Sequence, residues 1–177
     1  TPLYSSAASD VYKRQWHTLS LQMPVLPNEA EGKDYIPLLP EVPGRIQAGV
    51  DYFKARDVKN IVIIAHSLGG VMTNYYLAKK PDPAVRAYVS IGVSNATPGG
   101  FDSIAAYKDI KIPVLDVYGS QDLEGVIATA ATRASNSKHN KGFRQNKVEG
   151  ANHFFTGQQD ELIELVRDWL GKQVQTK

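Results

Sequence analysis

The stretch NIVIIAHSLGGVMTNYYL, residues 60–77, decides how the chain is expected to fold. Residues 61–65 are a short run of apolar, mostly β-branched side chains, which is typical of a strand buried on both faces of a parallel sheet. After the serine, Val71 and Tyr75 continue on one face at helical spacing. The pattern therefore predicts a strand, a sharp turn and a helix in direct succession.

Ser67 lies in that turn, with the small residues Ala65 and Gly69 two positions before and after it. A small-x-Ser-x-small pattern between a strand and a helix is the context of a nucleophile elbow, because the two backbones pass close together there. Ser67 would then be a nucleophile at the carboxyl edge of the sheet. The N–H of Leu68, at the N-terminus of the helix, would help to stabilise an oxyanion. The alternative is a serine that only caps the helix.

The rest of the chain alternates between strand-like and helix-like segments. Such alternation predicts an α/β fold, with a mostly parallel sheet and helices on both faces. Five prolines from residue 24 to residue 43 predict a long irregular connection, and Gly171 is expected to end the last helix. Strands are expected at residues 16–23, 61–65, 85–93, 112–119 and 143–150, and helices at residues 44–55, between residues 67 and 81, and at residues 101–108, 124–136 and 161–172.

A serine nucleophile needs a histidine base and an acid that orients this histidine, and in this architecture the acid comes before the histidine along the chain. Asp122 follows the strand expected at residues 112–119, and His153 follows the last expected strand. Both side chains are expected at the carboxyl ends of strands, where sites form in open α/β sheets. The sequence therefore predicts Asp122 as the acid and His153 as the base.

Other carboxylates and histidines compete for these two roles. Asp116 lies in mid-strand, where its side chain would point into a packed face, and Glu124 is a substitute acid in the turn. His66 adjoins the serine and is expected to point elsewhere, His139 lies in a polar loop, and His17 precedes the elbow. A lone histidine is more often structural than catalytic, so the choice of base rests on position along the chain.

Composition limits the functional classes. The 177 residues suit one domain with a substantial core. They are 42% hydrophobic and 21% charged, and the net charge of +2 comes with scattered basic residues, so no nucleic-acid-binding stripe or membrane-surface face is indicated. The absence of cysteine excludes disulfides and a thiolate nucleophile. No apolar run approaches the roughly 20 residues of a membrane span. Compartment and oligomeric state stay open.

The N-terminal residues need a separate interpretation. The segment SSAASDVYKRQ, residues 5–15, is polar and resembles a translated sequencing-adapter scar. Residues 1–15 are therefore expected to be non-native or disordered, and the alternative is a native flexible terminus. We expect residues 16–177 to form a single α/β domain that is the C-terminal portion of a longer protein.

Three segments resemble the nucleophile, acid and histidine segments of the α/β-hydrolase superfamily: IVIIAHSLGG, IPVLDVYGSQD and VEGANHFF. The resemblance covers residues 16–172 and is greatest to a bacterial branch known as domain of unknown function 3530. It implies that Ser67 is the nucleophile, Asp122 the acid and His153 the base of a carboxylesterase-like or lipase-like serine hydrolase. The implied reaction is hydrolysis of an ester or related acyl bond through an acyl-enzyme. A small-molecule acyl substrate is implied, and no metal or organic cofactor.

The resemblance also implies a difference from the family. Its members carry an upstream strand, which lies between the strands corresponding to residues 16–23 and 61–65, and a loop that donates the second oxyanion N–H. Residues 1–15 do not match these features. N-terminal strands missing from the sheet and an incomplete oxyanion hole are therefore expected.

Two other interpretations stay open beside the serine hydrolase. One is a catalytically inactive α/β-hydrolase-fold protein that binds a ligand or partner. The other is a small α/β binding domain whose Ser67 loop holds an anion at a helix N-terminus. The chain order of Ser67, Asp122 and His153 favours the hydrolase, because a binding module has no need of the histidine.

Overall fold

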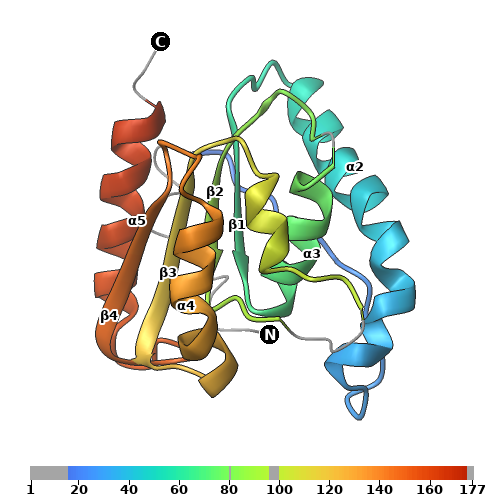
Figure 1. Cartoon of the computed structure of the whole chain (residues 1–177). Helices are drawn as coiled ribbons and strands as arrows, with labels where there is room; N and C mark the ends of the chain where they lie inside the picture. Colours follow the sequence, from blue (N-terminus) through green and yellow to red (C-terminus); the bar gives the residue numbers. More distant parts are fainter. Residues whose placement is uncertain (1–15, 80, 96–99, 175–177) are drawn as a thin grey trace.

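The computed structural model describes residues 16–79, 81–95 and 100–174 (Figure 1). The interpretation of residues 1–15 as a scar or a flexible terminus therefore lies outside the described residues. Among the residues described, no helix is both long and apolar enough to cross a membrane. In chain order the elements are η1 (Gly32–Glu41), α2 (Val42–Lys54), β1 (Ile61–His66), α3 (Leu68–Leu77), β2 (Val85–Ile91), η2 (Ala105–Lys108), β3 (Val114–Gln121), α4 (Glu124–Asn136), β4 (Arg144–Asn152) and α5 (Gln159–Val174).

The four strands form one sheet in the order β1-β2-β3-β4, and each neighbouring pair is parallel. His66, the last residue of β1, pairs with Ile91, which in turn pairs with Val117 of β3. The carboxyl ends of the strands therefore meet at one edge of the sheet, the lower edge in Figure 1. This parallel α/β arrangement confirms the fold class predicted from the alternation of the sequence.

The core is divided between the two faces of the sheet. Val89 of β2 packs in a cluster with α5, and the next residue toward the N-terminus, Tyr88, packs in a cluster with α2 and α3, because successive strand residues point to opposite faces. α4 lies on the second face, where its Arg133 reaches Asp116 of β3. Figure 1 accordingly has α5 on one side of the sheet and α2, α3 and α4 on the other. The predicted cover of helices on both faces is confirmed.

Several element boundaries differ from the sequence-based expectation. The proline-rich connection contains the 3₁₀ helix η1, and α2 begins at Val42 with Pro43 in its first turn, where a missing N–H costs no helical hydrogen bond. The helix expected at residues 101–108 is only the short η2. Gly171 does not end the last helix, because α5 continues to Val174. A glycine inside a helix costs only about 1 kcal/mol, so it stops the helix only where the backbone turns away.

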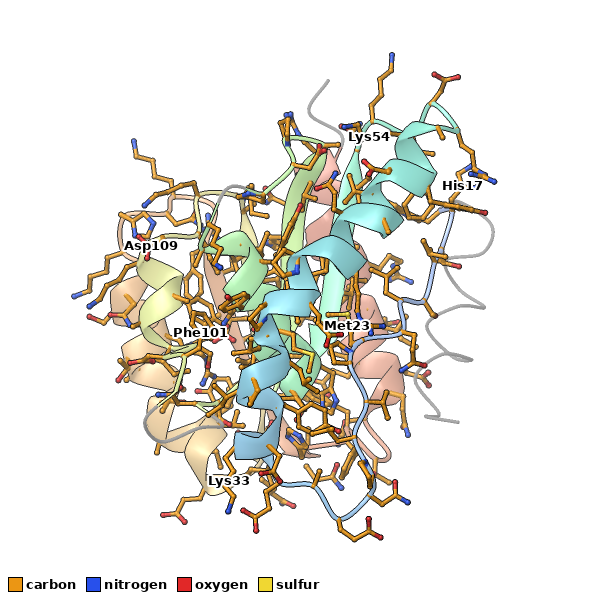
Figure 2. All side chains as sticks on the ribbon, turned by 90° about the vertical axis from the view of Figure 1, so that its right-hand side faces the viewer. His17, Met23, Lys33, Lys54, Phe101 and Asp109 are labelled. Atoms are coloured by element: carbon orange, nitrogen blue, oxygen red, sulfur yellow. The ribbon has the colours of Figure 1, made fainter. Side chains whose placement is uncertain are left out.

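The strand expected at residues 16–23 does not form. Trp16 packs against the cluster under α5, whereas Leu21 contacts α2 at Gly49, and Met23 lies beside α2 in Figure 2. The alternating apolar side chains therefore contact helices and core, and the backbone pairs with none of the described strands. An alternating pattern makes a strand only where a neighbouring strand accepts its hydrogen bonds.

β1 forms one edge of the sheet, and a cavity of about 380 Å³ lies along it. The cavity is bounded by β1, α2 and residues 19–23, and its lining is mostly apolar. Ile64 of β1 is 50% exposed, although it belongs to an otherwise apolar strand. The outer backbone groups of β1 have no strand partner among the described residues.

Candidate active site

Ser67 stands in the turn between β1 and α3, in a backbone conformation that non-glycine residues rarely adopt. Its φ is 53° and its ψ is −124°. Such a conformation costs on the order of 1–3 kcal/mol and persists only where the surrounding structure enforces it. The side chain makes no capping hydrogen bond to α3, so this serine is not a side-chain cap.

Two glycines after Ser67 allow α3 to start close to the sheet. A Cβ on Gly69 would lie 4.0 Å from the Cβ of Ala65, which is an ordinary contact, whereas a Cβ on Gly70 would overlap the side chain of Val93. The tightest approach is therefore at Gly70, one residue later than the small-x-Ser-x-small pattern indicates. Leu68 is the first residue of α3, so its N–H has no partner four residues earlier in the helix.

The structure brings Ser67, His153 and Asp122 together from three parts of the chain. His153 Nε2 lies 2.9 Å from Ser67 Oγ, and His153 Nδ1 lies 2.6 Å from Asp122 Oδ1. Ser67 follows β1, Asp122 follows β3 and His153 follows β4, so the parallel sheet delivers all three side chains to its carboxyl edge. The side chains of Asp122 and His153 are buried.

The chemistry of the partners fixes where the protons lie. The Asp122 carboxylate only accepts hydrogen bonds, so the proton of a neutral His153 is on Nδ1. His153 Nε2 is then unprotonated and accepts the hydrogen bond that the Ser67 hydroxyl donates. This arrangement holds a basic nitrogen next to the serine hydroxyl.

Backbone groups keep Asp122 ionised. Burial by itself raises the pKa of the Asp122 carboxyl, but hydrogen bonds from His153 and from two backbone N–H groups outweigh it, so the pKa lies below its ordinary value. The N–H of Leu123 donates to Oδ1 at 2.8 Å, and the N–H of Gly119 donates to Oδ2 at 3.2 Å. The turn after β3 thus orients the carboxylate and stabilises its charge.

The model of the family described as "Protein of unknown function (DUF3530)" matches residues 37–172, which is most of the chain. The chain belongs to the DUF3530 family. The chain has no match among curated protein sequences.

Solved structures similar to this DUF3530 protein have the α/β-hydrolase fold. A predicted CIB-like hydrolase from Thermoplasma acidophilum is 27% identical with a TM-score of 0.59, over 75% of this chain and 59% of that one. A putative α/β hydrolase from Agrobacterium tumefaciens is 23% identical with a TM-score of 0.59, over 71% of this chain and 57% of that one. Est1E from Butyrivibrio proteoclasticus is 18% identical with a TM-score of 0.64, over 77% of this chain and 71% of that one. The chain thus spans less than three-fifths of the length of the first two.

The competing acid and base candidates of the DUF3530 protein lie elsewhere. Asp116 is fully buried in an ion pair with Arg133, and Glu124 is exposed in the first turn of α4. His139 contacts the backbone carbonyls of Asn136, at the end of α4, and of Ile110. His17 is exposed and lies at the end of the molecule that also carries Lys54, opposite the carboxyl ends of the strands (Figure 2). Across the described ranges, no group of three or more acidic or histidine residues could hold a metal ion.

Hydrogen bonds and a buried side chain fix the turn after β4, and sequence analysis did not predict these contacts. The side chain of Asn152 accepts hydrogen bonds from the N–H groups of Phe154 and Thr156, at 3.0 and 3.1 Å. Phe155 has a φ of 53° and is fully buried in the core under α5. The turn therefore directs His153 towards the serine while Phe154 lies exposed beside the imidazole, with ring centroids 5.3 Å apart.

Arg133 is a second feature that sequence analysis did not single out. Its guanidinium donates to Asp116 of β3, to the carbonyl of Val93 after β2, and to the carbonyl of Val126 in α4, each at 2.9 Å. It therefore ties α4 to the interior of β3 and to the segment that follows β2. An arginine in the last turn of an alanine-rich helix gives no sign in sequence of where it points.

Proposed function

We propose that the chain is a serine hydrolase that cleaves an ester or related acyl bond through an acyl-enzyme, as carboxylesterases and lipases do. The observation that carries the proposal is the continuous hydrogen-bonded series from Ser67 Oγ through His153 to Asp122. The proton positions along this series match those needed for a histidine to act as general base. In the proposal Ser67 is the nucleophile, His153 the base and Asp122 the orienting acid.

The first half of the reaction transfers the acyl group to the enzyme. Ser67 Oγ attacks the substrate carbonyl carbon while its proton passes to His153 Nε2. The negative charge that develops on the carbonyl oxygen is stabilised by the N–H of Leu68 at the start of α3. The tetrahedral intermediate then breaks its bond to the leaving alcohol, which takes the proton from His153. Asp122 stabilises the His153 imidazolium, which exists from the attack of Ser67 until the leaving alcohol takes the proton.

The second half of the reaction frees the enzyme. Water attacks the acyl-enzyme carbonyl and gives its proton to His153 Nε2, and the intermediate collapses when that proton returns to Ser67 Oγ. The product is a carboxylic acid. Every proton in this cycle is carried by residues of the chain, so no metal or organic cofactor is part of the proposal.

The family fold supports hydrolysis as a general class, and the hydrogen-bonded series of Ser67, His153 and Asp122 supports the proposal of serine chemistry. The triad alone does not determine whether the leaving group is an alcohol or an amine, because the same chemistry cleaves esters and amides. An incomplete oxyanion hole would lower the rate, since one missing donor costs about 100- to 1,000-fold in turnover. Sensitive substrates and covalent probes are therefore the appropriate measurements.

The test is labelling of the chain by a fluorophosphonate probe, followed by turnover of p-nitrophenyl esters of increasing chain length and of a matched anilide. Ser67→Ala should abolish labelling and turnover while the circular dichroism spectrum stays native. Ser135→Ala, which changes an exposed serine on α4, is the matched control and should behave as the native chain. A native chain that is folded but never labelled would instead favour the catalytically inactive, ligand-binding alternative.

A further inference from the structure

His66 is connected both to Ser67 and to His153. It is the last residue of β1 and directly precedes Ser67 in the chain, and its side chain contacts the backbone of His153. His66 Nε2 lies 2.8 Å from the backbone oxygen of His153, and the centroids of the two imidazole rings are 4.6 Å apart, with 41° between their planes. The sequence predicts that His66 points elsewhere, and its side chain in fact reaches the backbone of His153.

The contact defines the protonation of His66. A backbone carbonyl can only accept a hydrogen bond, so His66 must donate and its Nε2 carries the proton. Burial is the main influence on His66 and lowers its pKa, which favours the neutral ring. The charged groups that act on this ring are His153, whose charge would disfavour a second cation, and Asp122, which raises the pKa of His66 by less than burial lowers it; the Phe154 ring lies beside it, with its centroid 6.0 Å away. A neutral His66 can therefore stack on His153 even while His153 is protonated.

This hydrogen bond connects elements that are distant in sequence. The two residues are 87 positions apart, and β2 and β3 separate their strands in the sheet. On the Ser67 side, the N–H of Ser67 donates to the carbonyl of Ile91 at 2.9 Å. On the His153 side, Asn152 holds the N–H groups of the turn, and His66 holds the carbonyl. The bond thus links the residue before Ser67 directly to the backbone of His153.

We propose that His66 is a positioning residue, which fixes the backbone of His153 so that Nε2 stays within hydrogen-bonding distance of Ser67 Oγ. The inference rests on the proposed function for its effect on turnover. Misplacement of a reacting group by about 1 Å can lower a rate by about 100-fold. Loss of this hydrogen bond should therefore lower kcat and leave KM nearly unchanged, because the bond acts on the position of His153 rather than on the binding of substrate.

Two variants distinguish the effect of the His66 hydrogen-bond donor from the effect of its aromatic ring. His66→Phe keeps an aromatic ring beside His153 but removes the N–H, and His66→Gln supplies an amide N–H at a similar reach without the ring. We expect kcat for a p-nitrophenyl ester to fall about 10- to 100-fold in His66→Phe and to recover in His66→Gln. His139→Phe is the matched control, because His139 also contacts backbone carbonyls, at 3.2 Å, in a loop outside the site. It should keep the native kcat.

Nuclear magnetic resonance gives a readout that does not depend on turnover. In the native chain, the ¹⁵N-labelled ring of His66 should be the Nε2–H tautomer, and the Nδ1–H of His153 should give a sharp downfield signal because it is held by Asp122. That signal should broaden in His66→Phe and sharpen again in His66→Gln. An unchanged His153 signal together with an unchanged kcat in His66→Phe would overturn the inference. Absence of fluorophosphonate labelling in the native chain would overturn the proposed function alone.

Discussion

Gly92 lies directly behind the imidazole of His153. A Cβ placed on Gly92 would stand 3.1 Å from both Cε1 and Nδ1 of His153 and 3.4 Å from Asp122 Oδ2. The φ of Gly92 is +57°, a conformation that costs a residue with a side chain roughly 1–2 kcal/mol. The backbone at Gly92, directly after β2, therefore forms a close-fitting wall against His153 and Asp122.

Gly92→Ala should consequently impair the site beyond its effect on stability. We expect the backbone conformation to lower the free energy of unfolding by about 1–2 kcal/mol, and the added methyl group to displace His153 and lower kcat by at least about 10-fold. Gly157→Ala is the matched control, since Gly157 has a φ of +79° but nothing within 4 Å of the added Cβ. Urea unfolding and ester turnover are measured on both. Equal kcat in the two variants would contradict the role of the Gly92 wall.

Replacement of Asp122 by asparagine should abolish the base without unfolding the chain. The asparagine side chain can donate to His153 Nδ1, which moves the proton of the neutral ring to Nε2 and leaves nothing to accept from Ser67. The corresponding change costs on the order of 10,000-fold in turnover in serine proteases. Glu124→Gln tests the neighbouring substitute acid and should leave ester turnover unchanged, because Glu124 is exposed on α4. A large loss in Glu124→Gln would reassign the acid.

The same carboxyl should contribute to acid unfolding. The pKa of Asp122 is lowered in the folded chain, so its contribution to stability is fully present above the ordinary carboxyl value of about 3.9 and is lost as the pH falls through the lowered pKa. We therefore expect the free energy of unfolding to fall less steeply in Asp122→Asn than in the native chain as the pH is lowered below about 4. Urea titrations at several pH values measure the two slopes. Parallel slopes would show that Asp122 has the same pKa in the folded and unfolded chain.

The grouping of the site residues could be predicted because it depends on local patterns. Ser67, Asp122 and His153 each follow a segment whose sequence predicts a strand. The carboxyl ends of parallel strands meet at one edge of a sheet. The sequence therefore placed all three residues near one another without any knowledge of the loops. Their order along the chain decided between the competing carboxylates and histidines.

The features that the sequence did not reveal depend on contacts between distant segments. The alternating pattern in residues 16–23 does not indicate whether a strand or a helix packs against this segment. In the structure, α2 lies beside residues 19–23. The contact of His66 with the His153 carbonyl depends on the path of a turn 87 residues away. In the same way, Gly92 carries no pattern of its own, because its neighbours in space are His153 and Asp122 rather than its neighbours in sequence.

The buried ion pair beneath the site should be costly to break. The side chains of Arg133 and Asp116 are fully buried and 2.9 Å apart. Arg133→Met leaves the carboxylate unpaired in the interior, so the free energy of unfolding should fall by about 3–5 kcal/mol. Adding Asp116→Asn removes that charge and should recover at least about 1 kcal/mol. Arg45→Met, which breaks a partly exposed pair with Glu41, should cost less than about 1 kcal/mol by the same urea titration. An additive double variant would mean that the two charges do not interact.

The open edge of β1 should govern how the chain associates with itself. Ile64 is 50% exposed on this strand, and the outer N–H and C=O groups of β1 lack a strand partner within the described part of the chain. Exposed apolar edges pair with other chains, and a lysine on an edge strand prevents such pairing because its charge would have to be buried. Ile64→Lys should therefore reduce concentration-dependent association in sedimentation velocity.

A second exposed isoleucine distinguishes edge pairing from a general effect of surface hydrophobicity. Ile127 is 41% exposed on α4, where the backbone hydrogen bonds are made within the helix. Ile127→Lys adds the same charge and removes a side chain of the same kind, so it should leave association unchanged if strand pairing is the cause. Equal reductions in the two variants would attribute association to surface hydrophobicity in general. A native chain that stays monomeric up to about millimolar concentration would mean that residues 19–23, across the cavity from β1, protect the edge well enough by themselves.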